Sequence, residues 1–156
     1  MALRIHLQQP PGPAVVDPVG VKRFARAVLA GAGVTGGAMT LVLTDDAGIR
    51  DLNARYRGID APTDVLAFPL HEADETGAVY LGDVVISFER AREQAPRIHN
   101  TLEPELARLI AHGLLHLLGH DHHTPHQGRA MKAAERRALA AYRRGTLLRR
   151  LARESA

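Results

Sequence analysis

Residues 112–123 read His112-Gly113-Leu114-Leu115-His116-Leu117-Leu118-Gly119-His120-Asp121-His122-His123, and they determine the fold and chemistry that the sequence predicts. The segment leading into them is apolar nearly all round, which predicts a buried helix. Four residues turn a helix by ~400°, so His112 and His116 project from one face about one turn apart. Gly119 lets the chain leave the helix sharply, and His122 can then return as a third nitrogen ligand.

Three nitrogen ligands leave a fourth coordination position for water, which is the arrangement of a catalytic rather than a structural zinc site. We therefore expect one divalent metal ion, first of all Zn²⁺, on His112, His116 and His122. Imidazole ligands also suit nickel, copper or iron. The alternative is that these histidines are core side chains with ordinary hydrogen-bond partners. The weaker ligand candidates, which also suit surface or supporting roles, are His120, His123 and His126.

The composition narrows the kinds of site that are available. The chain has 156 residues with nine histidines and no cysteine. The absence of cysteine excludes a disulfide scaffold, a thiolate zinc finger, an iron–sulfur cluster and a cysteine nucleophile. No run reaches ~18 apolar residues, and the first residues lack the layout of a signal peptide. We expect a cytoplasmic protein without a membrane span.

The charge is concentrated at the C-terminal end. Residues 1–123 hold 11 basic and 15 acidic residues, whereas residues 124–156 hold 9 basic and 2 acidic ones. Such a basic segment suits a polyanionic partner, and it is equally typical of a solvated helix face.

Apolar patterning and turn residues predict a single α+β domain over residues 1–156, with a small mixed sheet packed against helices and the histidine site at the end of the buried helix. Expected strands cover Leu3–Gln8, Met39–Thr44, Thr63–Leu70 and Val79–Phe88, the last two joined as a hairpin by an eight-residue loop. Expected helices begin after Asp17, Asp45 or Asp46, Ser87, Thr101 and Pro125, and the third of them stops at Pro96. A turn-rich break is expected at Pro10–Pro13.

The spacing His-x3-His-x2-Gly-x2-His is that of metzincin-type zinc peptidases. Those enzymes carry a glutamate directly after the first histidine as their general base, whereas this chain has Gly113 there. The chain therefore has the metal ligands of such a peptidase but lacks its general base.

The segment 112–122 resembles the signature of the YbeY family of bacterial endoribonucleases, and three upstream segments agree with it in order. They read Leu-Asn-Ala-Arg-Tyr-Arg-Gly over residues 52–58, Pro-Thr-Asp-Val-Leu-Ala-Phe-Pro over 62–69 and Leu-Gly-Asp-Val-Val-Ile-Ser over 81–87. The family usually has serine where this chain has Ala67, so one hydroxyl is missing. The resemblance covers about residues 39–136 and leaves out the basic tail at 138–156.

This resemblance implies an α+β fold with a metal ion held by His112, His116 and His122. It implies metal-dependent cleavage of single-stranded RNA, with roles in maturing ribosomal RNA, notably the small-subunit 3′ end, and in ribosome quality control. The implied partners are single-stranded RNA, ribosomal RNA and ribosomal subunits. It also singles out Arg57 as an arginine that faces the metal site.

Our mechanistic hypothesis uses water on the metal as the nucleophile and Arg57 as the clamp that binds the phosphate. The general base and acid are unassigned. Asp121 suits either an orienting role toward an imidazole or a turn role beside Gly119. Asp64 and Asp83 are expected to be turn or capping residues.

Two rival functions remain open from the sequence. One is a non-catalytic ribosome-assembly factor with a structural metal, whose basic C-terminal helix docks on ribosomal RNA. The other is a metal hydrolase of another substrate, such as a peptide, although Gly113 argues against it.

Overall fold

A computed structural model describes residues 3–10 and 15–149 of the chain. Pro11–Pro13 of the expected break and residues 150–156 of the basic tail lie outside the described residues. The described part contains a four-stranded sheet in the order β1-β2-β4-β3. The strands are β1 (Arg4–Gln8), β2 (Ala38–Thr44), β3 (Val65–Ala73) and β4 (Val79–Ser87). Because β1 and β4 run parallel to β2 while β3 is antiparallel to β4, the sheet is mixed, as expected.

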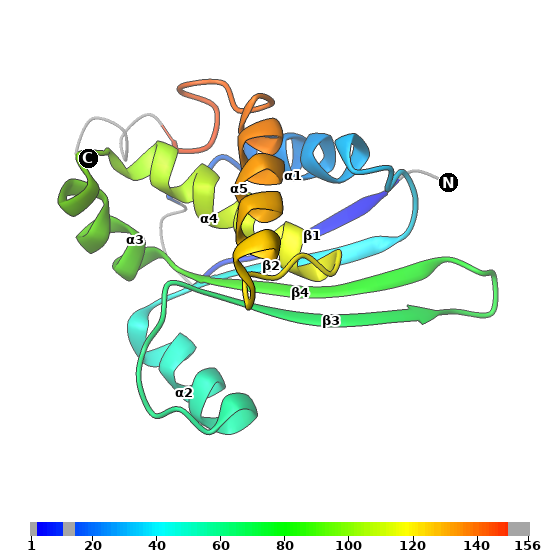
Figure 1. Ribbon diagram of the computed structural model, residues 1–156, viewed down its shortest axis with the longest axis horizontal. Coiled ribbons are helices and arrows are strands. Elements are labelled where there is room, and N and C mark those ends of the chain that lie inside the picture. Colours follow the sequence, from blue (N-terminus) through cyan, green and yellow to red (C-terminus); the bar gives the residue numbers. More distant parts are fainter. Residues whose placement is uncertain (1–2, 11–14, 150–156) are drawn as a thin grey trace.

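Five α-helices and a short 3-10 helix are formed within the described residues. They are α1 (Pro18–Gly31), α2 (Asp46–Arg57), α3 (Phe88–Gln94), η1 (Ala95–Ile98), α4 (Leu102–Leu117) and α5 (Pro125–Leu139). Figure 1 shows α1, α4 and α5 on one face of the sheet and α2 on the other. This arrangement confirms the predicted α+β fold. Among the described helices, none is long and apolar enough to cross a membrane.

Alternation along the strands divides the apolar side chains between these two faces. The large core cluster contains Leu41, Val84 and Ile86 together with buried residues of α1 and α4. Val85, which lies between the last two, packs instead with Leu66 of β3 and Ile49 of α2 in a smaller cluster. The sheet therefore separates the buried helix α4 from α2, and both helices reach the cleft described below.

The helix starts follow the capping expectations with one exception. The Asp17 carboxylate accepts hydrogen bonds at the start of α1, Asp45 rather than Asp46 caps α2, and the Ser87 hydroxyl accepts from the backbone N–H of Arg90. Thr101 occupies the cap position of α4, but its hydroxyl makes no capping hydrogen bond. The expectation of a side-chain cap at Thr101 is wrong.

Two connections differ from those expected. The link between β3 and β4 is Asp74–Ala78 and not an eight-residue loop, because the strands stay paired as far as Ala73 and Val79. The helix α3 ends at Gln94, just before Pro96 as expected, but the chain then continues into η1. Pro96 lies in the first turn of η1, where no helical hydrogen bond requires its missing N–H.

Candidate metal centre

The first two histidines lie on α4, one turn apart as the spacing predicts. Nε2 of His112 is 3.1 Å from Nε2 of His116, and the ring centroids are 4.6 Å apart. Both imidazoles are half-buried, because the rest of this helix end faces the core. The helix thus holds the two ring nitrogens close together at the edge of the apolar core.

The third histidine is returned to the pair by the turn after α4. Gly119 has a φ of 96°, a left-handed conformation that glycine adopts without strain, and its N–H donates to the carbonyl of His116 at 3.0 Å. The ring of His122 then lies 5.5 Å from that of His116 and 6.0 Å from that of His112. Within the described residues, one ligand atom from each of these three histidines lies within 4.8 Å of the others.

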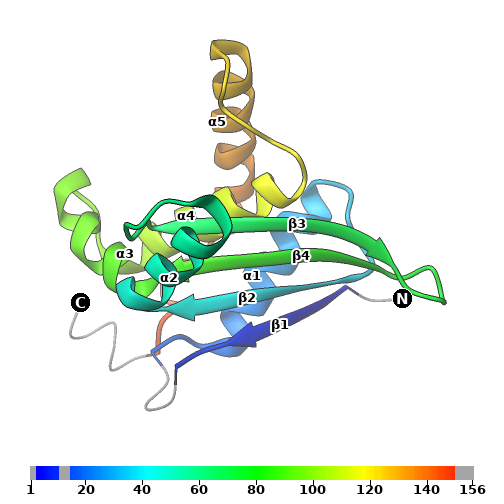
Figure 2. The same cartoon turned by 90° about the horizontal axis from the view of Figure 1, so that it is seen from below.

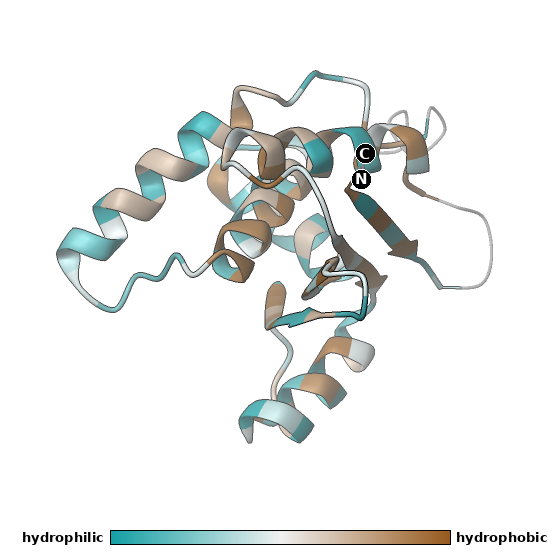
Figure 3. Cartoon of the chain, turned by 90° about the vertical axis from the view of Figure 1, so that its right-hand side faces the viewer, coloured by the Kyte–Doolittle hydropathy of each residue, from teal (hydrophilic) through white to brown (hydrophobic). Residues whose placement is uncertain are grey.

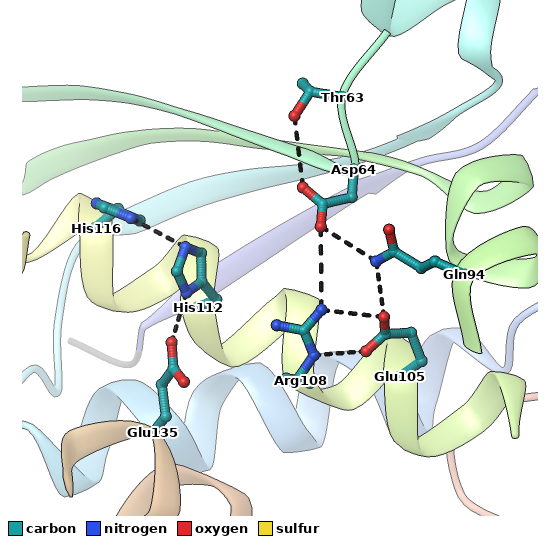
Figure 4. Close-up of polar contacts among 8 residues, drawn as sticks. All are labelled: Thr63, Asp64, Gln94, Glu105, Arg108, His112, His116 and Glu135. Atoms are coloured by element: carbon teal, nitrogen blue, oxygen red, sulfur yellow. Dashed lines mark hydrogen bonds and ion pairs between the residues drawn. The ribbon is translucent and has the colours of Figure 1, made fainter. Parts of the chain in front are cut away.

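A carboxylate from another helix orients His112. Oε1 of Glu135, on α5, lies 2.5 Å from Nδ1 of His112 (Figure 4). The hydrogen bond from His112 lowers the pKa of Glu135, so this side chain is an ionised acceptor. Nδ1 of His112 must therefore carry the proton, which leaves the Nε2 lone pair directed at the histidine group. Glu135 could not be predicted from the sequence as a partner of His112, because the contact depends on how α5 packs against α4.

The donor set fits a divalent metal ion. Burial lowers the pKa of His116, and the neighbouring imidazoles His112 and His122 lower it further, so this ring is neutral and has a free lone pair near pH 7. Two imidazole nitrogens bound at ~2.0–2.1 Å to a tetrahedral zinc are roughly 3.3 Å apart. The 3.1 Å between the two Nε2 atoms of His112 and His116 is close to this value.

The histidines open into a cleft of about 720 Å³. Its lining includes Arg57 at the end of α2, residues 63–67 at the start of β3 and the loop at 119–123. Arg57 is exposed, and its guanidinium has no hydrogen bond or ion pair with any other described residue. The structure thus brings Arg57 to the same cleft as the three predicted ligands and leaves its donors available.

Asp64, also on the cleft lining, belongs to a polar network that the sequence analysis did not anticipate. Its Oδ2 accepts from Nε2 of Gln94 at 3.1 Å and lies 4.0 Å from the guanidinium of Arg108 (Figure 4). Glu105, one turn before Arg108 on α4, bonds to both of these partners. Asp83, within β4, accepts from the Tyr80 hydroxyl. Asp64 lies in the bend before β3, as expected of a turn residue, although its side chain also joins other helices. Asp83 lies within β4 and bonds locally to Tyr80, so the turn or capping role expected for Asp83 is wrong.

Asp121 lies in the loop between two histidines. It accepts from the backbone N–H of His122 at 2.8 Å and lies 2.9 Å from Nε2 of His123. The backbone hydrogen bond from His122 lowers the pKa of Asp121. Nδ1 of His122 is 4.0 Å away, beyond hydrogen-bond distance. These contacts favour the turn role over the orienting role.

Gly113 is required by packing. A Cβ added at this position would lie 2.5 Å from Cγ1 of Val84 and 3.1 Å from Cγ2 of Val65. The helix approaches the sheet so closely here that no side chain fits without displacing it. The glutamate of a metzincin-type peptidase has no place in this packing.

Two histidines at the end of a buried helix and a third from the following loop converge at a cleft that Arg57 also lines, which defines an α+β protein with a hydrolase-type candidate metal site. The family model described as Endoribonuclease YbeY matches residues 20–143, and the chain belongs to this family. The match extends on both sides of the region that the motifs cover. It includes all of α5 and ends at Arg143.

Individual relatives agree with the family model. The Endoribonuclease YbeY of Gloeobacter violaceus is 50% identical over 138 residues, which cover 81% of this chain and 70% of the relative. The one from a Roseiflexus species is 42% identical over 142 residues, or 85% of this chain and 88% of the relative. The solution structure of TM1509 from Thermotoga maritima is similar at 27% identity with a TM-score of 0.54, covering 88% of this chain and 89% of that one.

Proposed function

We propose that this protein is a metal-dependent endoribonuclease that cleaves single-stranded RNA, with Zn²⁺ as the ion its three imidazoles fit. Its expected roles are maturation of the small-subunit ribosomal RNA 3′ end and ribosome quality control in the cytoplasm, with ribosomal subunits as partners. One observation carries this proposal: the three-histidine group opens into the cleft that also presents Arg57, whose guanidinium has no partner among the described residues. Membership of an endoribonuclease family supports RNA as the substrate.

In this proposal His112, His116 and His122 hold the ion, and Glu135 keeps the proton of His112 on Nδ1. A divalent ion, when bound, activates water and polarises phosphate oxygens. Arg57 binds the phosphate through its planar fork of donors and stabilises the negative charge that develops during cleavage. Its freedom from other partners within the described chain leaves all of these donors available.

Proton transfer requires a further group in the cleft. The carboxylates among the described lining residues are Asp64 and Asp121. Asp64 is held in place by Gln94, whereas Asp121 is occupied by the backbone of its own loop. A peptide substrate is disfavoured, because the position of the peptidase base is filled by the contact between Gly113 and Val84.

The deciding experiment incubates metal-loaded protein with single-stranded RNA, duplex RNA and casein, with and without a chelator. We expect chelator-sensitive cleavage of the single-stranded RNA alone. Cleavage of casein would show a hydrolase of another substrate. RNA binding without any cleavage would show an assembly factor whose metal is structural. Metal analysis of the purified protein identifies the ion in the same preparation.

A further inference from the structure

Three cations form a line along the outer side of α5. Met131, Ala134 and Ala138 are the buried residues of this helix. Arg129, Lys132 and Arg136 are all exposed and recur at helical spacing on the opposite side. We call these three residues the basic stripe. Figures 2 and 3 show that α5 projects from the body of the domain, which leaves this side open to solvent.

The stripe residues have no acidic partner among the described residues, unlike the ion-paired arginines of the body. Arg50, Arg55 and Arg97 each form an ion pair with an aspartate or glutamate. None of the stripe residues makes an ion pair within the part of the chain that the structure describes. Glu135 is the one acidic residue of α5, and it turns inward to His112.

The arrangement works against the stability of the helix itself. Arg129 and Lys132 are three residues apart, and Lys132 and Arg136 are four apart, so like charges face one another along the helix. The helix dipole favours cations only in the last turn, which accounts for Arg136 but not for the other two. A solvated helix face gains nothing from this spacing, whereas a bound polyanion neutralises all three charges.

The position of α5 favours an RNA strand as that polyanion. The helix starts at Pro125, directly after the cleft-lining His122 and His123, and its Glu135 contacts a proposed metal ligand. A strand that leaves the cleft on this side passes along α5. The exposed cations Arg143, Arg144 and Arg149 follow in the next segment.

We propose that the basic stripe is a second RNA-binding surface, which binds phosphates of the single strand outside the cleft. This inference rests on the proposed RNA substrate. It implies that long substrates bind more tightly than short ones and that the additional affinity is electrostatic. Each phosphate contact with a single strand contributes about 0.7 to the slope of log affinity against log salt.

The test compares the triple variant Arg129→Gln, Lys132→Gln, Arg136→Gln with a charge-matched control, Arg4→Gln, Arg92→Gln, Arg97→Gln. The control cations are exposed and lie on β1, α3 and η1. Binding is measured by fluorescence anisotropy over a range of salt, with 2′-O-methyl RNA of about six and about 24 nucleotides whose integrity is checked by gel after each measurement. Thermal unfolding verifies that both variants fold.

We expect the stripe variant to bind the long RNA at least about tenfold more weakly at low salt, with a salt slope smaller by about 2. Its binding and cleavage of the short RNA stay at the wild-type level, and the control keeps wild-type affinity for both. If the stripe variant keeps the wild-type salt slope, or if the control variant loses as much affinity for the long RNA, the stripe is not an RNA-binding surface. Either result leaves the proposed function intact. Stripe-dependent binding to phosphatidylglycerol vesicles that is tighter than binding to the long RNA also overturns it. Failure of the wild-type protein to bind either RNA overturns the proposed function as well.

Discussion

Nδ1 of His112 and Oε1 of Glu135 lie 2.5 Å apart, although 23 residues separate them in the chain. The contact joins α5 to the end of α4 and fixes which nitrogen of His112 carries the proton. A ligand imidazole with a carboxylate behind it is oriented before the ion arrives and is a stronger base. Glu135 is therefore a positioning residue for the proposed metal site.

Glu135→Gln should weaken metal binding by about 10–100-fold, because the amide lacks the charge that holds the Nδ1 proton. The measurement is competition with a chromophoric chelator, which is independent of nuclease activity. Glu93→Gln is a suitable control, since its carboxylate pairs with Arg90 and Arg97 and not with a histidine. Equal affinities for wild-type protein and the Glu135 variant would contradict the positioning role.

The histidine group was predictable because its signal is local. His112 and His116 share a helix face, and Gly119 marks the turn that returns His122. Glu135 was not predictable, because its contact depends on how α5 packs across α4. The same holds for Asp64, whose partners Gln94 and Arg108 come from two other helices.

In the fold, too, local features could be predicted from the sequence, whereas features that depend on tertiary packing could not. Element types followed from apolar periodicity and caps, such as Asp17 before α1 and Ser87 before α3. The strand order was not readable, because β4 inserts between β2 and β3 and pairs with both. The residues of β4 are buried on both faces of the sheet, which favours a central position. A single sequence does not show which strands lie on either side of it.

Arg57→Ala should lower cleavage of single-stranded RNA by about 10²–10³-fold and leave metal affinity unchanged, because Arg57 stabilises charge on the phosphate and binds no ion. The matched control is Arg55→Ala on the same helix, whose side chain already pairs with Asp51. Chelator competition and a cleavage assay on the same preparations separate the two effects. Wild-type cleavage by the Arg57 variant, with the metal still bound, would remove this residue from the mechanism.

Gly113→Ala should destabilise the protein, because the new methyl group would lie 2.5 Å from Val84 Cγ1. Overpacking costs about 1–3 kcal/mol, and the better helix propensity of alanine offsets about 1 kcal/mol of it. Gly128→Ala on α5 is the control, since nothing lies within 4 Å of its added Cβ. It should be neutral or raise the free energy of unfolding by up to about 1 kcal/mol. Denaturant unfolding measures both, and equal effects would refute the close approach of α4 to the sheet.

The buried carboxylate of Glu103 should make stability depend on pH. At the start of α4, only 6% exposed, it accepts from the Tyr142 hydroxyl at 2.6 Å and from the backbone N–H groups of Gly145, Leu147 and Leu148. Burial raises the pKa of Glu103, but these hydrogen bonds outweigh burial and lower it. A lowered pKa in the folded state gives stability that is present above the unfolded value, about 4.3, and lost as pH falls through the folded value.

Glu103→Gln should therefore lower the free energy of unfolding by about 1–3 kcal/mol at pH 7, because an amide cannot accept from four donors through one oxygen. The gap between wild type and variant should narrow as the pH falls below about 4, where the wild-type carboxylate also becomes protonated. Denaturant melts from pH 7 to acid measure this gap, with the exposed Glu75→Gln as the control. A gap that stays constant across this range would mean that the contact is held by shape alone and that the charge of Glu103 contributes nothing to anchoring residues 142–148.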